Sequence, residues 1–402
     1  MRLVQPKRLA ALGALVLGAG VLVACVPPPP PPPPPTMVDD DGQAAPGDCD
    51  ATTTATTTIG AAVSAVANGT HIDVCPGTYA EQLTIPDTKD DITLTSTTSR
   101  AATIKAPASI AEPGDIIRIN GATGWTIEGF VIAGPLPNSL FCSVETRAGL
   151  FVAGGGSVTV DDNQFTQIRA ADPNLRGCQN GIAIRVGRQA TPTSGTATIT
   201  NNLFDTYQKG AIVIDGNGSS ADVLVNTVTG DGPVPHIAQN GIQFSRGATG
   251  NAAGNTVTGH TYSPAPASSS TGVLLFQSGP GLVVNNNDVR ENDDNIALFD
   301  ADGVTVHQNA ARNSTEFDGL FADEDSTGNQ FTENFASGND AFDCEDLSTA
   351  IAVPPVANTW TDNTGTTSFP PGICTPPFGG PTQTQGQQSK AQAAGHAVQP
   401  VG

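Results

Sequence analysis

The side-chain types needed to remove a proton beside a carboxylate group occur in the middle of the chain, at Arg185, Lys209, Asp215 and Arg246. A β-elimination requires a base that takes this proton and a cation that stabilises the enolate that forms. An arginine or the lysine could serve, while Asp215 and Asp231 could bind Ca²⁺, which prefers carboxylate oxygens. We therefore treat these residues as candidate catalytic and metal-binding groups. The alternative is that Arg185 and Asp215 form only a surface ion pair.

Aromatic rings offer a second kind of site, at Phe276, Phe299 and Phe321, with Gln243 as a polar neighbour. Exposed rings of this kind can stack on sugar rings, so we treat these residues as candidate substrate-binding groups. The alternatives are that the rings stack on one another, or that a loop or the C-terminal tail covers them.

Acidic residues concentrate toward the C-terminal end of the chain. Stacked carboxylates repel one another, so some of them could bind Ca²⁺, although the nonapeptide repeat of calcium-binding β-helices is absent. The alternative is a solvated acidic face. We therefore expect no required cofactor and treat Ca²⁺ as an optional ion. The acids are Asp293, Asp294, Asp300, Asp302, Asp318, Asp323, Glu324, Asp325, Asp340, Asp343, Glu345 and Asp346.

The candidate residues lie on or near a repeated strand unit. Aligned on a small residue or Asn, its copies are anchored at positions 149, 181, 211, 241, 272, 295, 319 and 341. The first and third positions after the anchor are apolar in every copy, as in Ile212 and Ile214, whereas the second and fourth positions vary. This alternation predicts a strand with one buried face. In this alignment Arg185 and Asp215 fall in one outward-facing column, one repeat apart.

A second unit, Asn-x-apolar, lies between these strands, as at Asn226-Thr-Val228. The anchors are 22 to 32 residues apart, which favours a solenoid over a propeller, whose blades need about 40 residues. Two or three short strands per repeat predict an all-β parallel β-helix, in which each coil buries its apolar face against its neighbours. The recurring Asn predicts a ladder at the corners, because its amide can bond corner backbone groups and the same Asn one coil away.

Over about residues 56–375 the pattern resembles the pectin-lyase-like proteins, in particular the secreted family built from generic β-helix repeats. The segment 73–81 at the start of the repeats and the segment 358–374 at their end are similar to the first and last sequence segments of that family. The resemblance implies a single-stranded right-handed parallel β-helix with a substrate groove along the outward face of the repeated strand. It implies no single activity, because the family holds lyases, hydrolases, epimerases and members without known chemistry.

Two further readings of the resemblance rank lower. Asp293-Asp294 is faintly similar to the paired acids of polygalacturonases, and a hydrolase needs two carboxylates about 5–10 Å apart. The His-Gly and Arg-Lys steps of that family are missing. A role in metal-site maturation, as in some periplasmic β-helices, would need clustered His, Met or Cys for copper, and this chain lacks them.

The N-terminal region predicts export and a lipid anchor. Residues 1–24 combine basic residues with a short apolar run, which is typical of a secretory signal peptide. The run ends in Leu22-Val23-Ala24-Cys25, which resembles a bacterial lipobox and implies cleavage before Cys25 and lipidation of its thiol. An ordinary signal peptide is the alternative. Residues 25–48, with an unbroken proline run at 27–35, are predicted to be a stiff linker that holds the folded part away from a membrane.

Beyond the linker we predict one domain over residues 49–376 and a disordered tail over 377–402, where Gly, Gln, Ser and Ala dominate. Ile59, Ala62, Val63 and Val66 have helical spacing. A short helix here would cover the open N-terminal end of the solenoid, which otherwise exposes apolar residues and strand edges.

Cysteine usage agrees with export. Seven cysteines leave one unpaired, and Cys25 is the natural odd one. Six cysteines allow 15 pairings, of which we predict the local order Cys49–Cys75, Cys142–Cys178 and Cys344–Cys374. These pairs would fasten both ends of the domain and one loop.

The charge balance restricts the partners. The chain has 38 acidic and 17 basic residues, a net charge of −21, so it lacks the basic surface that nucleic-acid binding needs. The leading hypothesis is a monomeric, lipid-anchored protein outside the cell that binds extracellular polysaccharide or has a structural role at the cell surface. The alternative is a polysaccharide lyase or epimerase that acts on uronate-containing glycans, with or without Ca²⁺.

Overall fold

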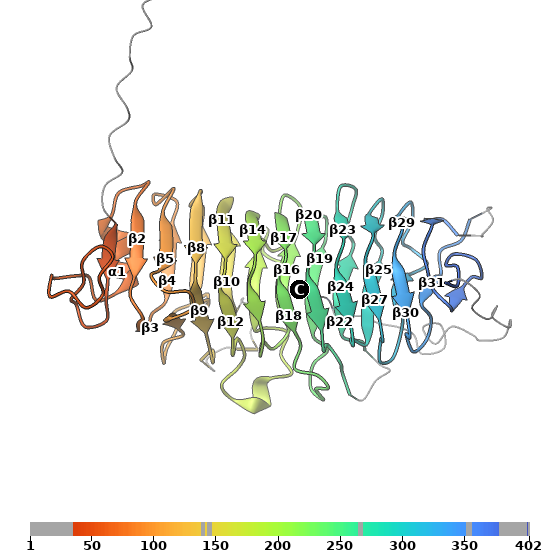
Figure 1. Cartoon of the computed structure of the whole chain (residues 1–402), viewed down its shortest axis with the longest axis horizontal. Coiled ribbons are helices and arrows are strands. Elements are labelled where there is room, and N and C mark those ends of the chain that lie inside the picture. The colour runs from red at the N-terminus through yellow and green to blue at the C-terminus, as the bar shows by residue number, and fades with distance from the viewer. Residues whose placement is uncertain are drawn as a thin grey trace, which may run out of the picture. The chain divides into compact units, whose positions relative to one another are not determined.

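The computed structural model describes residues 35–137, 141–142, 147–263, 268–350, 356–377 and 400. The chain divides into two compact units, residues 1–33 and 34–402, and the described residues belong to the second. In this unit short strands follow one another around a coil, and successive coils stack from α1 (Ile59–Ala65) and β2 (His71–Val74) at one end to β31 (Cys344–Asp346) at the other (Figure 1). Cys25, the signal peptide, residues 25–34 of the predicted linker and most of the predicted tail lie outside the described residues.

Each complete coil contributes one strand to each of three parallel sheets, in the chain order 12-stranded, 10-stranded, 11-stranded, and the coils at the two ends contribute fewer. The strands of the 12-stranded sheet are β1 (Thr36–Val38), β2, β5 (Thr93–Ser96), β8 (Trp125–Glu128), β11 (Gly156–Asp161), β14 (Gly195–Thr200), β17 (Ser220–Leu224), β20 (Thr249–Ala253), β23 (Val283–Asn285), β26 (Thr305–His307), β29 (Gln330–Thr332) and β32 (Thr359–Thr361).

The 10-stranded sheet follows after a corner. Its strands are β3 (Gly77–Ala80), β6 (Ala102–Lys105), β9 (Phe130–Ala133), β12 (Gln164–Thr166), β15 (Leu203–Phe204), β18 (Thr227–Thr229), β21 (Thr256–Thr258), β24 (Asp288–Arg290), β27 (Ala310–Arg312) and β30 (Phe335–Ser337).

The 11-stranded sheet contains the repeated strand unit found in the sequence. Its strands are β4 (Leu83–Pro86), β7 (Ile117–Asn120), β10 (Ala148–Ala153), β13 (Ile182–Val186), β16 (Gly210–Asp215), β19 (Asn240–Ser245), β22 (Thr271–Phe276), β25 (Asp294–Phe299), β28 (Leu320–Ala322), β31 and β33 (Ser368–Phe369). The predicted all-β parallel β-helix is confirmed.

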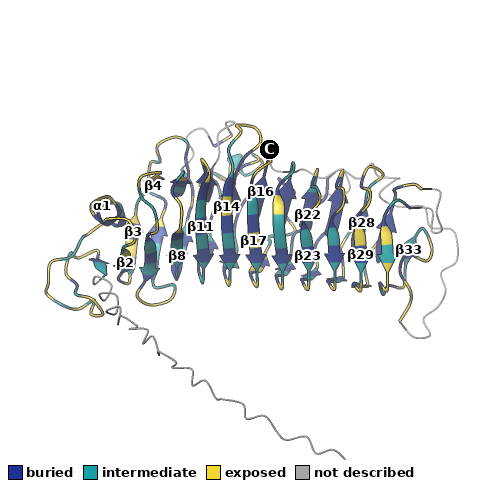
Figure 2. Cartoon of the chain, turned by 90° about the horizontal axis from the view of Figure 1, so that it is seen from above, coloured by how far each residue is buried: buried dark blue, intermediate teal, exposed yellow. Residues whose placement is uncertain are grey.

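The inward side chains of successive coils form one apolar core, and buried residues run along the strands of every coil (Figure 2). Ile214, Phe244, Leu275 and Leu298 follow one another in register and are fully buried. The alternation in the sequence thus identifies correctly the face that these strands bury.

The register of one copy differs from the prediction. Ile184 pairs with Ile212, not with Ile214, and Arg185 pairs with Val213. The predicted step from Arg185 to Asp215 in one column is therefore wrong by two residues, whereas Asp215 pairs with Ser245 on the next strand, as the alignment predicts. The displacement arises at the corner before β13.

At that corner Gly181 has φ +78°, so it belongs to the turn and the strand begins only at Ile182. Ile182 occupies the position of Gly210 and packs with Phe151 and Val213 in a small outer cluster. The prediction that Ile182 points into the core is wrong for the same reason.

The Asn ladder is confirmed at the corner between the 12- and 10-stranded sheets. Each amide nitrogen donates to the amide oxygen of the next Asn, at 2.9–3.1 Å, and also to a backbone carbonyl of the preceding coil. Each accepting oxygen also receives a backbone N–H. These bonds satisfy buried corner groups that the sheets leave unpaired. The ladder consists of Asn163, Asn202, Asn226, Asn255, Asn287, Asn309, Asn334 and Asn363.

The N-terminal end is closed by α1, as predicted. Ile59, Ala62 and Val63 are buried and join the core. The Glu81 carboxylate accepts bonds from the Ile59 and Gly60 N–H groups at 2.8 and 2.9 Å, and Lys89 donates to the Ser64 and Val66 carbonyls at the other end. The stack begins earlier than position 49, because β1 pairs with β2 within the stretch predicted as linker.

Three disulfides close in the predicted local order, Cys49–Cys75, Cys142–Cys178 and Cys344–Cys374. Disulfides persist in oxidising compartments, which supports an exported protein. Among the described residues, no helix is long and apolar enough to cross a membrane.

Candidate functional site

The predicted catalytic residues Arg185, Asp215 and Arg246 form an ion-pair network on the outer side of β13, β16 and β19. Both Asp215 oxygens accept a guanidinium: Arg185 Nη2 lies 2.8 Å from Oδ2 and Arg246 Nη1 lies 2.9 Å from Oδ1. Ser245 Oγ and the Gln189 N–H donate to the same carboxylate at 2.9 Å each. Asp215 and Arg185 are fully buried, and burial lowers the pKa of Arg185 to about 10. Asp215 therefore acts as the acceptor that holds the two arginines.

This geometry does not fit a calcium site at Asp215 and Asp231. A cation at Asp215 would face two guanidinium groups, which repel it. Asp231 lies in a different corner loop and pairs with Arg169. Within the described residues, the group of metal-ligand side chains that lie close together is Asp39 with Cys49 and Cys75, and these two thiols are used in a disulfide.

The candidate sugar-binding residues are packed rather than open. Phe299 and Phe321 are buried, with ring centroids 5.2 Å apart, and Phe276 lies partly buried against the same cluster. The Arg246 guanidinium lies 5.3 Å from the Phe276 ring centroid. Gln243 is fully buried and donates to Ser245 Oγ at 2.9 Å. Of the alternatives left open by the sequence, ring-on-ring packing describes Phe299 and Phe321.

Lys209, the fourth predicted catalytic residue, lies directly before β16 and is fully buried. Its Nζ donates to the Ala238 carbonyl at 2.5 Å. Burial lowers the pKa of Lys209 to about 7, and no neighbouring charge contributes to the shift. Lys209 is therefore separate from the Arg185–Asp215–Arg246 network.

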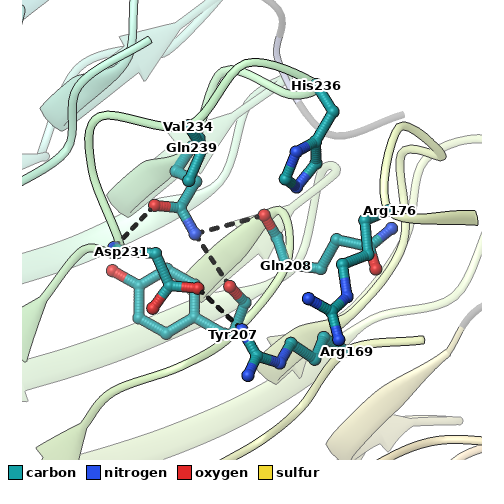
Figure 3. Close-up of a pocket in the computed structure, with 8 residues that line it drawn as sticks. All are labelled: Arg169, Arg176, Tyr207, Gln208, Asp231, Val234, His236 and Gln239. Carbon is teal, nitrogen blue, oxygen red and sulfur yellow. Dashed lines mark hydrogen bonds and ion pairs between the residues drawn. The ribbon is translucent and has the colours of Figure 1, made fainter. Parts of the chain in front are cut away.

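The described residues also contain a polar pocket of about 300 Å³ that the sequence did not predict (Figure 3). Three successive coils build it where the 10-stranded sheet turns into the 11-stranded sheet, through the loops after β12, β15 and β18. Its lining consists of Arg169, Arg176, Tyr207, Gln208, Asp231, Val234, His236 and Gln239.

Two guanidinium groups and one carboxylate line this pocket, and a second carboxylate, Asp205, lies close enough to interact with Arg169. Arg169 Nη1 lies 3.2 Å from Asp231 Oδ2. Among the described residues the Arg176 guanidinium has no hydrogen-bond or ion-pair partner, and its Nε is buried. No dashed line reaches this side chain in Figure 3. Burial and the nearby Arg176 charge lower the pKa of Arg169. A pocket lined by two guanidinium groups and one carboxylate, in a chain of net charge −21, is suited to bind an anion, and we call it the anion pocket.

Glutamines hold the pocket floor in place. The Gln239 amide donates to the Tyr207 carbonyl at 2.7 Å and accepts from the Asp231 N–H at 2.9 Å. Gln208 donates to the Leu175 and Cys178 carbonyls at 3.1 and 2.8 Å. These bonds tie the loop that carries Arg176 to the floor, and the Cys142–Cys178 disulfide closes the same loop.

Two histidines lie at or behind the pocket. His236 is exposed at its rim, and partial burial followed by the Arg176 charge lowers its pKa. His260 is fully buried; its Nε2 contacts the Tyr207 hydroxyl and its Nδ1 lies 2.7 Å from Asn292 Oδ1. Because Oδ1 only accepts, Nδ1 carries the proton and Tyr207 donates to Nε2.

Sequence reasoning placed Asp231 and Lys209 near this region but missed Arg169 and Arg176. Both arginines lie in an irregular segment between β12 and β13, where no period fixes the direction of a side chain. The one feature of the sequence that could have pointed to these arginines is the length of the segment, since long loops commonly carry functional residues.

The chain matches the family described as "Right handed beta helix region" over residues 189–353. No curated protein matches it by sequence. Among solved structures it is similar to the GH136 lacto-N-biosidase from Eubacterium ramulus, with 11% identity and a TM-score of 0.53 over 75% of this chain and 60% of that chain. The chain thus spans about 60% of the length of that relative.

Lower similarity links the chain to two other proteins. One is the pectin methylesterase from Aspergillus niger, with 15% identity and a TM-score of 0.45 over 69% of this chain and 85% of that chain. The other is the A-module of the mannuronan C-5 epimerase AlgE4 from Azotobacter vinelandii, with 12% identity and a TM-score of 0.47 over 87% and 100%. The family match and the similarity to the lacto-N-biosidase confirm the right-handed parallel β-helix resemblance at the level of the fold.

Proposed function

We propose that this right-handed parallel β-helix protein binds an extracellular polysaccharide, and that the anion pocket takes an acidic sugar of that polymer. The observation that carries the proposal is the unpaired Arg176 guanidinium beside Arg169. A guanidinium offers a planar pair of N–H donors that matches a carboxylate or a sulfate. A pocket of about 300 Å³ is at the small end of ligand pockets, which suits one sugar unit better than a long segment.

A role on glycans is also supported by the fold. The GH136 lacto-N-biosidase, whose backbone is similar, is by its name a glycan-cleaving enzyme. A β-helix offers a long flank on which a polymer can lie, and the corner loops of successive coils can contact successive units.

The test compares acidic and neutral glycans. The mature protein should bind polymers or oligomers of uronate or sulfated sugars on a glycan array, and Arg176→Gln should weaken this binding by at least tenfold, because it removes the uncompensated charge. Arg312→Gln is the matched control, since Arg312 pairs with Asp288 on the outer side of the 10-stranded sheet. Binding that does not distinguish acidic from neutral glycans, or that survives Arg176→Gln, would contradict the proposal.

A second candidate function is proton abstraction from a bound uronate, which leads to elimination or epimerisation. The observation that favours it is His236, whose lowered pKa keeps the imidazole neutral at pH 7, next to two guanidinium groups that could stabilise an enolate. Elimination produces an unsaturated uronide that absorbs ultraviolet light. His236→Ala should abolish the absorbance gain. The same assay on Arg185→Ala and Asp215→Ala tests the residues first nominated from the sequence.

We further propose that the protein is attached to a membrane through a lipid on Cys25 and faces the outside of the cell. The disulfides support export, and the Leu22–Cys25 motif supports the anchor. Mass spectrometry of the membrane-fraction protein should find a lipid-modified N-terminal Cys25, and Cys25→Ser should release the protein into the soluble fraction.

A further inference from the structure

Four apolar side chains on the outer side of the 11-stranded sheet are buried although they do not belong to the core. Leu274, Ala297 and Phe321 follow one another in register on β22, β25 and β28. The residues directly before and after each of them point inward and belong to the core, so these three point outward. Together with Phe299 they form a separate cluster, which we call the outer patch, and no member is more than 8% exposed.

The described part of the chain offers little apolar cover for the outer patch. Among the described residues, the further apolar side chains packed against it are Phe276, from the same sheet, and Leu347, which directly follows β31. A side chain that stands out from an uncovered sheet keeps part of its surface in water. Leu274 and Ala297 are nevertheless 0% exposed. Their burial therefore calls for a further segment over the patch.

The C-terminal segment starts close to the outer patch and is long enough to cover it. Cys374 is joined to Cys344 of β31, and Thr375 bonds to Asn363, so the chain leaves the last coil beside the end of the 11-stranded sheet. The 22 residues 378–399 can span about 70 Å when extended. Since β28, β25 and β22 follow β31 in the sheet, the far side of the patch is only about 15 Å away.

The charge of this segment also suits the surroundings of the patch. Three fully buried carboxyl groups lie beside it: Asp294 begins β25, Glu345 pairs with Phe321, and Asp318 lies near both. Residues 378–402 contain no acidic residue, one lysine at position 390, and several glutamines whose amides can donate to carboxyl oxygens. An acidic segment would be repelled at this place, whereas this one is not.

We propose that residues 378–402 lie along the outer side of the 11-stranded sheet and cover the outer patch. The composition of this segment is too poor in apolar residues to form a core of its own, but such a segment can order on a surface that is already formed. The inference goes beyond the proposed function, because the anion pocket lies in the corner loops and does not require this segment. Any external ligand of the outer patch must displace a segment of the same chain, which competes at an effective concentration of about millimolar.

The first experiment compares the full mature chain with a chain that ends at Pro377 and uses the uncharged dye Nile red as a probe for exposed apolar surface. Dye fluorescence should be severalfold higher with the shortened chain, because it exposes the outer patch. Leu274→Ser should reduce this gain, whereas Val283→Ser, on the outer side of β23 in the 12-stranded sheet, is the matched control and should not. Equal fluorescence of the two chains overturns the proposal and assigns the cover to residues that both chains share.

The second experiment measures the fluorescence anisotropy of a labelled peptide with the sequence of residues 378–402. The peptide should bind the shortened chain and not the full chain, in which the attached segment occupies the patch. Leu274→Ser in the shortened chain should weaken binding by about tenfold through the lost apolar contact, and Val283→Ser should not. Equal binding to both chains, or no binding to a shortened chain that keeps its melting transition, overturns the proposal.

A measurement on the full chain keeps the proposal testable if the shortened chain does not fold. Amide hydrogen exchange of residues 382–399 should be at least about tenfold slower in the protein than in the free peptide. Leu274→Ser should reduce this protection, and Val283→Ser should leave it unchanged. Exchange in the protein that is as fast as in the free peptide overturns the proposal. None of these measurements involves an acidic glycan, so their outcome is independent of the anion pocket.

Discussion

Val225 is a β-branched residue whose backbone adopts an unfavourable left-handed conformation. It has φ +56°, in the left-handed region, and is 61% exposed. The same corner in other coils carries Asp162, Asn201 and Asn286, which tolerate this region through their short polar side chains. A β-branched residue there costs about 1–2 kcal/mol, and the exposed side chain makes few contacts that could offset this cost.

Val225→Asn should therefore stabilise the protein by about 1 kcal/mol, measured by chemical denaturation of the mature chain. The mirror variant Asn286→Val, at φ +53°, should destabilise it by a similar amount. A loss of stability in Val225→Asn would mean that Val225 makes a contact that offsets its backbone strain.

At the same scale, sequence reasoning distinguishes positions that repeat from positions that do not. The corner Asn residues recur at one place in each coil, so their ladder could be predicted before any coordinates. Arg176 occurs once, in a loop whose path depends on the Cys142–Cys178 disulfide and the Gln208 bonds. No local pattern encodes such a path.

Among the elements, the Asn ladder offers the sharpest test of what holds the coils together. Asn255 donates to Asn287 Oδ1 and to the Val223 carbonyl, and accepts from the Asn226 backbone N–H and amide. Asn255→Ala leaves these buried groups without partners, at a cost of about 1–3 kcal/mol for each group left unsatisfied.

We expect Asn255→Ala to lower the free energy of unfolding by about 3 kcal/mol. Asn217→Ala, at an exposed position, is the control and should change it by less than about 0.5 kcal/mol. Equal effects in the two variants would show that water replaces the ladder bonds.

The helix α1 is held by the coil beneath it rather than by its own length, since seven residues are too few to form a stable helix alone. Glu81→Ala removes the acceptor of the Ile59 and Gly60 N–H groups and should cost about 1–2 kcal/mol. Hydrogen exchange of residues 59–66 should accelerate, while Glu324→Ala, at an exposed site, should leave it unchanged. Unchanged exchange rates in Glu81→Ala would mean that apolar packing alone stabilises the helix.

The apolar periodicity predicted which face of the strands is buried, but it could not predict the pairing register of β13, which follows a long loop, with its neighbouring strands. A shift by two residues keeps the alternation of faces, so Arg185 still points outward while its neighbours change. Asp215 nevertheless meets Arg185 diagonally, because the long arginine side chain spans the offset.

For the whole molecule, several buried carboxyl groups hold protons that the unfolded chain would release. Burial raises the pKa of Asp115 to about 7 and of Asp293 to about 6, and burial with the nearby Glu345 and Asp294 raises the pKa of Asp318. A raised folded-state pKa contributes stability that is fully present below about pH 4 and is lost as pH rises through the folded value.

The melting temperature should accordingly fall between pH 5 and pH 8. Asp318→Asn keeps an acceptor for the Phe342 N–H but replaces one titrating carboxyl group with an amide. It should therefore reduce the decrease in melting temperature between pH 5 and pH 8. Asp222→Asn, at an exposed site, should leave it unchanged. A melting temperature that rises over this range in the wild type would contradict the prediction.

The anion pocket stands on corner loops from three successive coils, whereas the strands below them bond only to the coils on either side. Ligand preference and structural integrity therefore depend on different parts of the polypeptide. The exposed parts of these loops, such as Pro233, Pro235 and His236, could be exchanged for those of another solenoid to create a new specificity, and the coils would still stack. A lineage built this way can diversify what it recognises much faster than it alters its framework.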